Sequence, residues 1–375
     1  MTPLSVLDLS NVTTQTPPSQ ALQRSVELAQ AVERFGYKRY WLAEHHSMAS
    51  IASSAPDIMI ARIAAATSTI RVGSGGVMLT NHAPLVIAER FKTLEALFPG
   101  RIDLGLGRAP GTDQATSYAL RRRLDERPGD DFLERLQELM LWESGDFPEN
   151  HPFRKIQVMP SDAPLPPLWL LGSSDYSAHL SGRIGAGYAF ASHFSDYDAV
   201  EPMLAYRTAF EPVADLREPY SIIAVAAVVA ESDEEADRLA QTYDLNWLRR
   251  ARNMRLPLSS PEEAAAHPWT EQERAYVAQR RGRLFAGSAE TVTARLKEFA
   301  HATKADEIMV TSSIFDFDAR VRSYELLMDA WKAASGLTPH PAFAAGGSDE
   351  GITIPSSLIL KTASAMPVLH PQRGS

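Results

Sequence analysis

Two adjacent histidines in the stretch WLAEHHSM are the first candidates for chemistry, because imidazoles transfer protons near neutral pH. His45 and His46 follow Glu44 at the end of an apolar run. On an extended chain neighbouring side chains point to opposite faces, so both histidines cannot bind one metal ion. Their spacing also differs from the helical H-E-x-x-H zinc pattern. We expect one of them to face a binding site together with His193 of FASHF, although ordinary hydrogen-bonded histidines remain the alternative.

The stretch RIDLGLGRAPGTD places three glycines after another apolar run, as a dinucleotide-binding loop does. In such a loop the pattern G-x-G-x-x-G opens a helix whose N-terminus faces pyrophosphate. Here Gly111 comes one residue late and Pro110 lies inside the loop, and no helical pattern starts promptly. The dinucleotide interpretation is therefore rejected.

These glycines have a second interpretation, in which Gly105 and Gly107 let a planar ligand approach the end of a strand. Arg108 then stands at the rim, where a guanidinium suits a phosphate group. A rim salt bridge from Arg108 to Asp103 or Asp113 is an equally good interpretation of this segment.

A second candidate for anion binding is LLGSSDYSAHL, where a strand passes into a helix. Gly172, Ser173, Ser174 and Ser177 place hydroxyl groups and free backbone N–H groups at the start of that helix. Plain capping of the helix by Ser173, Ser174 or Asp175 is the alternative. Because capping and anion binding do not exclude each other, we favour a phosphate site.

The elements that must position these residues alternate along the chain between apolar strands and amphipathic helices. Eight strands, each followed by a helix, indicate a parallel sheet buried on both faces, and this number favours closure into a (β/α)₈ TIM barrel. The ligand of such a sheet binds at the carboxyl ends of the strands. The expected strands are 5–9, 38–43, 70–79, 101–107, 166–172, 187–192, 220–230 and 306–312.

Helical segments are expected between these strands, among them a long charged region over 232–300. The segment GSGGVML (73–79) places three glycines inside one strand, which indicates a bulge, unusual dihedral angles or close approach of a ligand. We expect one barrel domain over 1–335, followed by an irregular tail (336–375) rich in Pro, Gly, Ala and Ser.

Composition excludes several classes of protein. The net charge of −9 argues against a nucleic-acid partner. The longest apolar run, IIAVAAVVA, is too short to cross a membrane, and the N-terminal residues MTPLSVLDLS do not resemble a secretory signal. The chain has no cysteine, which excludes disulfides and thiolate metal sites. A cytoplasmic protein without a metal or a membrane anchor is expected.

Four motifs, in their order and spacing, resemble the bacterial luciferase-like family of flavin-dependent monooxygenases. They are AEHH (43–46), VGSGGVML (72–79), HAPLVIAERFKTLEALFPGRIDLGLGR (82–108) and LLGSSDYSAHLSGRIGAGYAFASHF (170–194). The resemblance runs from residue 4 to about 335. It implies a (β/α)₈ barrel that binds FMN at the mouth formed by the carboxyl ends of its strands.

The resemblance also implies roles for single residues. His45 matches the family's catalytic histidine, and the Gly75-Gly76 bond matches its non-proline cis peptide under the flavin ring. Arg108 matches the phosphate-binding arginine. Ser174 and Ser177 match the phosphate-binding hydroxyl pair.

Other positions qualify this picture. His46 falls where the family packs its dimer interface, and we expect His193 to line the substrate side. Gly107 replaces the reactive cysteine of luciferase itself, which argues against light emission but not against flavin binding. Ser173 replaces an acidic residue beside the phosphate.

The resemblance thus implies a monooxygenase that uses reduced FMN and O₂ on a small organic substrate. Since the chain shows no nicotinamide-binding fold, a separate flavin reductase is expected to supply FMNH₂. A homodimer is expected from the habit of the family. Two alternatives remain: a deazaflavin-dependent hydride-transfer oxidoreductase, and a flavin-binding protein without turnover.

Overall fold

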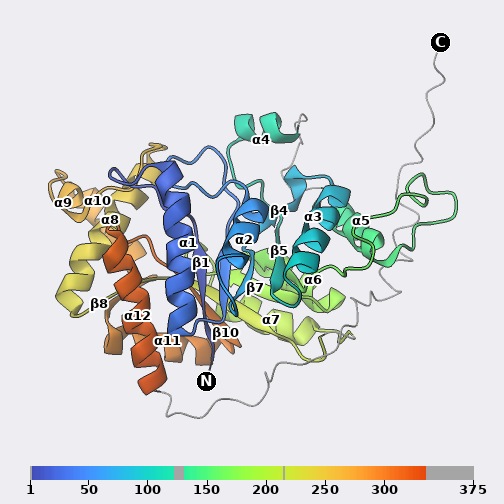
Figure 1. Ribbon diagram of the computed structural model, residues 1–375. Helices are drawn as coiled ribbons and strands as arrows, with labels where there is room; N and C mark the ends of the chain where they lie inside the picture. The colour runs from blue at the N-terminus through green and yellow to red at the C-terminus, as the bar shows by residue number, and fades with distance from the viewer. Residues whose placement is uncertain (1, 122–130, 214–215, 335–375) are drawn as a thin grey trace.

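The computed structural model describes residues 2–121, 131–213 and 216–334 and shows a closed parallel barrel. Strand β1 pairs with both β2 and β10, and β10 pairs in turn with β8, so the two ends of the sheet meet (Figure 1). The predicted barrel is confirmed. Its strands are β1 (Leu4–Asp8), β2 (Arg39–Leu42), β3 (Arg71–Ser74), β4 (Val77–Met78), β5 (Ile102–Gly107), β6 (Leu168–Gly172), β7 (Gly187–Ala191), β8 (Ser221–Ala230), β9 (Leu284–Ser288) and β10 (Glu307–Thr311).

Helices surround the barrel and cover the outer faces of its strands (Figure 1). Local sequence sets several of their ends. Pro18, Pro56 and Pro84 occupy first turns, where their missing N–H costs nothing, and Gly36 ends α1 with a left-handed φ of 93°. The helices are α1 (Pro18–Phe35), α2 (Pro56–Ala64), η1 (Leu79–Asn81), α3 (Pro84–Leu97), α4 (Gln114–Arg121), α5 (Phe132–Ser144), α6 (Asp175–Ile184), α7 (Val200–Ala209), α8 (Asp233–Ala251), α9 (Pro261–Ala265), α10 (Glu271–Arg281), α11 (Ala289–Thr303) and α12 (Phe317–Ala333).

The strand expected over 70–79 is divided into β3 and β4 by a cis peptide between Gly75 and Gly76, which confirms the cis bond that the resemblance implies. The backbones approach closely at this break. A Cβ atom on Gly76 would lie 2.7 Å from the carbonyl oxygen of Gly105, so a side chain does not fit there. The glycines of this segment therefore allow the backbone between β3 and β4 to lie in close contact with β5.

The prediction of a helical region over 232–300 missed one strand, because this region also contains β9. This strand pairs in parallel with the outer half of the long strand β8, from Ala226 to Ala230. Pairing with a distant strand thus overrides the helical pattern of the surrounding sequence. The tail predicted over 336–375 lies outside the described residues.

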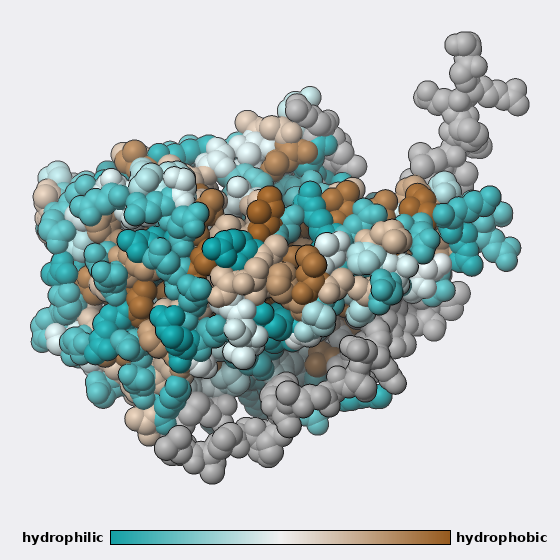
Figure 2. All heavy atoms as spheres, in the orientation of Figure 1, coloured by the Kyte–Doolittle hydropathy of each residue, from teal (hydrophilic) through white to brown (hydrophobic). Residues whose placement is uncertain are grey.

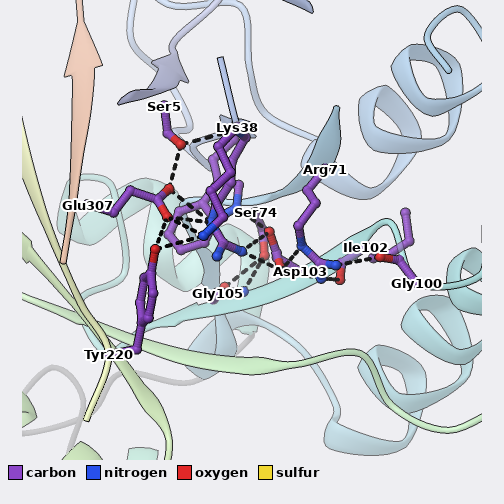
Figure 3. A network of polar contacts seen from close by, with 12 residues as sticks. Ser5, Lys38, Arg71, Ser74, Gly100, Ile102, Asp103, Gly105, Tyr220 and Glu307 are labelled. Carbon is purple, nitrogen blue, oxygen red and sulfur yellow. Dashed lines mark hydrogen bonds and ion pairs between the residues drawn. The ribbon is translucent and has the colours of Figure 1, made fainter. Parts of the chain in front are cut away.

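A buried ionic network closes the end of the barrel where the strands begin (Figure 3). Arg39 bridges two carboxylates: its Nη1 lies 2.9 Å from Asp103 Oδ2, and its Nε lies 2.9 Å from Glu307 Oε1. Trp41 Nε1 donates to Asp103, and the Tyr220 hydroxyl donates to Glu307. Both carboxylates are fully buried, so these hydrogen bonds and ion pairs compensate their loss of water.

Apolar residues fill the barrel interior and the space between strands and helices. Inside the barrel, the rings of Trp41 and Trp169 meet edge to face at 5.4 Å. Outside, hydrophilic residues cover much of the face in Figure 2, with smaller groups of apolar residues between them. Across the described ranges, the helices lack the combination of length and apolar character that a membrane span requires.

Candidate functional site

The carboxyl ends of β2 and β7 bring the two candidate histidines to the same mouth of the barrel. His45 follows β2, and its Nδ1 lies 3.4 Å from the carbonyl oxygen of Gly111. His193 follows β7, and its Nδ1 lies 3.4 Å from the carbonyl oxygen of Ala224. A carbonyl oxygen only accepts, so Nδ1 carries the proton in each ring. Nε2 is then a free acceptor in each ring, with no hydrogen-bond partner among the residues that the structure describes.

Both imidazoles are held in their neutral form. Burial lowers the pKa of His193 to about 4, and the charges of His45 and Arg250 act in the same direction. Burial also lowers the pKa of His45, and the positive charge of Arg250 lowers it further. The hydrogen bond to Gly111 has the opposite effect on this pKa, which is smaller than that of burial. At neutral pH each ring therefore offers a proton acceptor at the mouth.

The second histidine of the pair points elsewhere, as the alternation rule predicts. His46 Nε2 donates to Glu44 at 2.8 Å, and His82 Nε2 donates to the same carboxylate at 3.0 Å. Glu44 also accepts the backbone N–H of Met78, which ties the end of β2 to β4. Burial by itself would raise the pKa of Glu44. The hydrogen bonds from His46 and His82 outweigh this effect and lower the pKa to about 2. Sequence reasoning missed the role of Glu44 and His82 because their contact is tertiary.

This cluster does not form a metal site. Both imidazoles donate a hydrogen bond from Nε2 to the carboxylate of Glu44. The nitrogen and oxygen atoms that could bind a metal ion are therefore engaged with one another. Within 2–121, 131–213 and 216–334, no group of three or more His, Cys, Asp or Glu side chains is arranged to hold a metal ion.

The rim salt bridge considered for Arg108 does not form. Asp103 is buried in the barrel and pairs with Arg39 and Arg71. Asp113 pairs instead with Arg255 at 2.8 Å. Among the described residues, Arg108 has no carboxylate within ion-pair distance, and its guanidinium lies 4.4 Å from the ring centroid of Tyr176.

Tyr176 belongs to the first turn of α6, so this contact places Arg108 beside the N-terminus of that helix. Ser174 is the N-cap residue, but its hydroxyl makes no capping hydrogen bond. The buried Ser177 lies directly over Gly172, where an added Cβ would come within 2.7 Å of Ser177 Oγ. A guanidinium, two hydroxyls and the first N–H groups of a helix thus converge at the ends of β5 and β6.

Ser173 contributes to this corner through its backbone. Its carbonyl oxygen accepts the hydroxyl of Ser195 at 2.8 Å, which ties the β6 loop to the loop after β7. No side-chain oxygen caps α6, so the alternative of plain capping by Ser173, Ser174 or Asp175 does not hold.

Gly105 and Gly107 have a packing role at the end of β5. A Cβ atom on Gly105 would lie 2.1 Å from the carbonyl oxygen of Ser74, and one on Gly107 would lie 2.7 Å from Met78 Cε. Protein atoms therefore occupy the space that a side chain at either position would fill. These residues bring β5 close to β3 and β4.

Comparison with known proteins identifies the family and the fold of the chain. The family model described as luciferase-like monooxygenase matches residues 2–307. A luciferase-like monooxygenase of Escherichia coli is 41% identical over 87% of this chain and 96% of its own length. The N-acetyl-S-alkylcysteine monooxygenase of Bacillus subtilis is 32% identical over 88% of this chain and 98% of its own length.

A solved structure shows the same barrel. The crystal structure of apo-MsnO8 superposes with a TM-score of 0.81 at 39% identity, and the match covers 91% of this chain and all of the MsnO8 chain. Sequence and structure therefore agree over nearly the whole described barrel. The chain belongs to the family of luciferase-like, flavin-dependent monooxygenases.

Proposed function

We propose that this monooxygenase uses reduced FMN and O₂ to oxygenate a small organic substrate at the barrel mouth. The observation that carries the proposal is the unpaired donor set beside α6. Arg108, Ser174 and Ser177 offer a charge and two hydroxyls, yet none of these side-chain groups has an acceptor among the described residues. A phosphate monoester fits this donor set because it presents several acceptor oxygens and a negative charge.

The remaining residues of the mouth take complementary roles in this proposal. The Gly75–Gly76 peptide would support the flavin ring. Reduced FMN, when bound, supplies the electrons that activate O₂. His45 holds or moves a proton at Nε2, which its neutral tautomer leaves free, and His193 lines the substrate side.

The phosphate grip is tested by comparing FMN with riboflavin, which lacks the phosphate. We expect Arg108→Met to weaken FMN binding by about 10- to 100-fold, since it removes charge-assisted hydrogen bonds, and to leave riboflavin binding unchanged. Titrations followed by flavin fluorescence measure both affinities. Arg183→Met, at the exposed end of the same helix, is the matched control. Equal losses for FMN and riboflavin would contradict a phosphate contact.

We also propose that a separate flavin reductase supplies the reduced cofactor. The chain should not oxidise NADH in the presence of FMN, whereas an added reductase should start turnover. The test panel contains aldehydes, alkanes and N-acetyl-S-alkylcysteines, the last taken from the name of the B. subtilis relative. Incorporation of isotopically labelled O₂ into a product, detected by mass spectrometry, is the expected result. Hydrogen peroxide as the sole product would count against oxygenation.

We propose in addition that the protein forms a homodimer through the region of β2 and α2. Ile58 on α2 is 68% exposed, and Leu97 on the neighbouring helix α3 is 62% exposed. Contiguous apolar surface marks interfaces between chains, and the proposed interface would cover these two side chains. Sedimentation at low micromolar concentration tests the dimer, and a species with the mass of one chain would exclude it.

A further inference from the structure

Met78 places a thioether inside the mouth of the barrel. It is the last residue of β4 and pairs with Gly107 at the end of β5. Leu104 and Leu106 of β5 pack in the core that the strands share with the surrounding helices, so the alternating Gly107 faces the barrel axis. A Cβ atom on Gly107 would lie 2.8 Å from Met78 Sδ. The sulfur therefore lies on the axial side of β5, at its carboxyl end.

The same side chain packs against the residue that holds the ring of His45. A Cβ atom on Gly111 would lie 3.1 Å from Met78 Cγ and 3.7 Å from Met78 Sδ. The carbonyl oxygen of Gly111 lies 3.4 Å from His45 Nδ1, so the thioether and the imidazole meet at one residue of the rim. The backbone N–H of Met78 donates to the buried Glu44 at 2.8 Å, which fixes the end of β4. Met78 thus has a defined position beside the proposed proton-transfer group.

This position exposes the thioether to the chemistry proposed for the mouth. Met78 is half-buried, so it is not sealed inside the core. It follows by two residues the Gly75–Gly76 peptide, which would support the flavin ring. A thioether is soft and polarizable, and it takes up one oxygen atom to form a sulfoxide.

We infer that Met78 is a modification site, oxygenated by the protein's own reaction when no substrate occupies the mouth. The inference rests on the proposed function and adds a second fate for its oxygen. A bond forms between Sδ and one atom of O₂, the O–O bond breaks, and the other oxygen atom leaves as water. Reduced FMN supplies the electrons and hydrogens for this water and becomes oxidised FMN. The reactants FMNH₂, O₂ and thioether thus balance the products FMN, sulfoxide and H₂O.

The proposed origin of the oxygen predicts which methionines are modified. Free hydrogen peroxide arrives from solvent, so it should oxidise Met159 first, whose side chain is 55% exposed. Oxygen activated in the mouth should instead oxidise Met78. Met59 is the matched comparison, because it is half-buried like Met78 but lies on the outer helix α2. Methionine sulfoxide reductase should reverse the modification.

The test uses the full chain in excess over FMN, reduced without oxygen and then mixed with heavy-isotope O₂ in the absence of substrate. Catalase is present throughout and removes free hydrogen peroxide. Mass spectrometry of peptides measures the labelled sulfoxide at each methionine. We expect about tenfold or more label at Met78 than at Met59 and Met159, because proximity to the reacting oxygen outweighs exposure. Unlabelled hydrogen peroxide, added without catalase to protein with oxidised FMN, should oxidise Met159 most.

Met78→Leu keeps the volume of the side chain but removes the sulfur. In this variant the label at Met59 and Met159 should stay low, since the oxygen is not released to search for other thioethers. FMN affinity, measured by fluorescence titration, separates the two proposals. Normal FMN binding without label at Met78 overturns the inference and leaves the proposed function standing, whereas loss of FMN binding refutes both. Label that follows exposure, or the same excess at Met78 with free peroxide, also overturns the inference.

Discussion

Replacing His45 by alanine should lower the rate of substrate oxygenation by about 10²- to 10⁴-fold, the usual contribution of a positioned proton-transfer group. The reason is the free Nε2 of its neutral ring, which no other described residue engages. FMN affinity should change little, because the proposed phosphate contacts come from α6 and Arg108. Single-turnover product formation with pre-reduced FMN measures the rate.

The pH dependence of the same reaction provides a second readout. Burial and the charge of Arg250 hold the pKa of His45 below its ordinary value of about 6.5. The neutral ring is therefore fully populated above that value and is lost as pH falls through the lowered pKa. Oxygenation by the unsubstituted protein should follow this titration at acidic pH, and the titration should be absent in His45→Ala.

Two further measurements distinguish proton transfer from a structural role. Added imidazole should restore part of the activity of His45→Ala, because it can supply the missing group in the space left by the side chain. His301→Ala, at the exposed C-terminal turn of α11, serves as the matched control and should behave like the unsubstituted protein. A rate within a factor of two of the unsubstituted protein in His45→Ala would exclude a role in proton transfer.

Asp103→Asn should lower the free energy of unfolding by about 3–5 kcal/mol, the usual cost of removing one partner from a buried ion pair. The carboxylate is fully buried and lies between Arg39 and Arg71. An amide keeps the volume of this side chain but removes the counter-charge of Arg71 and one of the two carboxylates that Arg39 contacts. Urea unfolding followed by tryptophan fluorescence measures the change. Asp162→Asn, at an exposed position without ion pairs, should alter stability by less than about 0.5 kcal/mol.

Acid should narrow the difference between the Asp103→Asn variant and the unsubstituted protein. The charges of Arg39 and Arg71 hold the pKa of Asp103 well below its ordinary value, against the effect of burial. The ion pairs therefore contribute their full stability above the unfolded-state pKa of about 3.9, and this contribution is lost as pH falls towards the folded-state pKa. A stability difference that stays constant from pH 7 to pH 3 would show that the carboxylate charge is not its source.

The local sequence determined most of the secondary structure. Apolar runs such as YSIIAVAAVVA (220–230) form strands because both faces of a parallel sheet are buried, and β8 occupies nearly this range. Helix α1 follows its apolar spacing and ends at Gly36, whose left-handed conformation costs a glycine little. The number of these units was sufficient to predict the barrel, and its family resemblance identified the cis bond between Gly75 and Gly76.

The residues of the candidate site could be predicted only in part from the sequence. Strand ends identified His45, His193, Arg108 and the serines before α6, because the carboxyl ends of parallel strands meet at one edge. The sequence left open whether Arg108 pairs with a carboxylate. That question was decided by Asp103 and Asp113, which bind other arginines.

Only the tertiary structure decided the contacts between residues far apart in the chain. The bond from His82 to Glu44 and the pairing of β9 with β8 have no local pattern. The physical reason is that periodicity reports which face of an element is buried, but not which partner buries it. Partners at the mouth are chosen by loop paths and strand register, and these depend on the closure of the whole barrel.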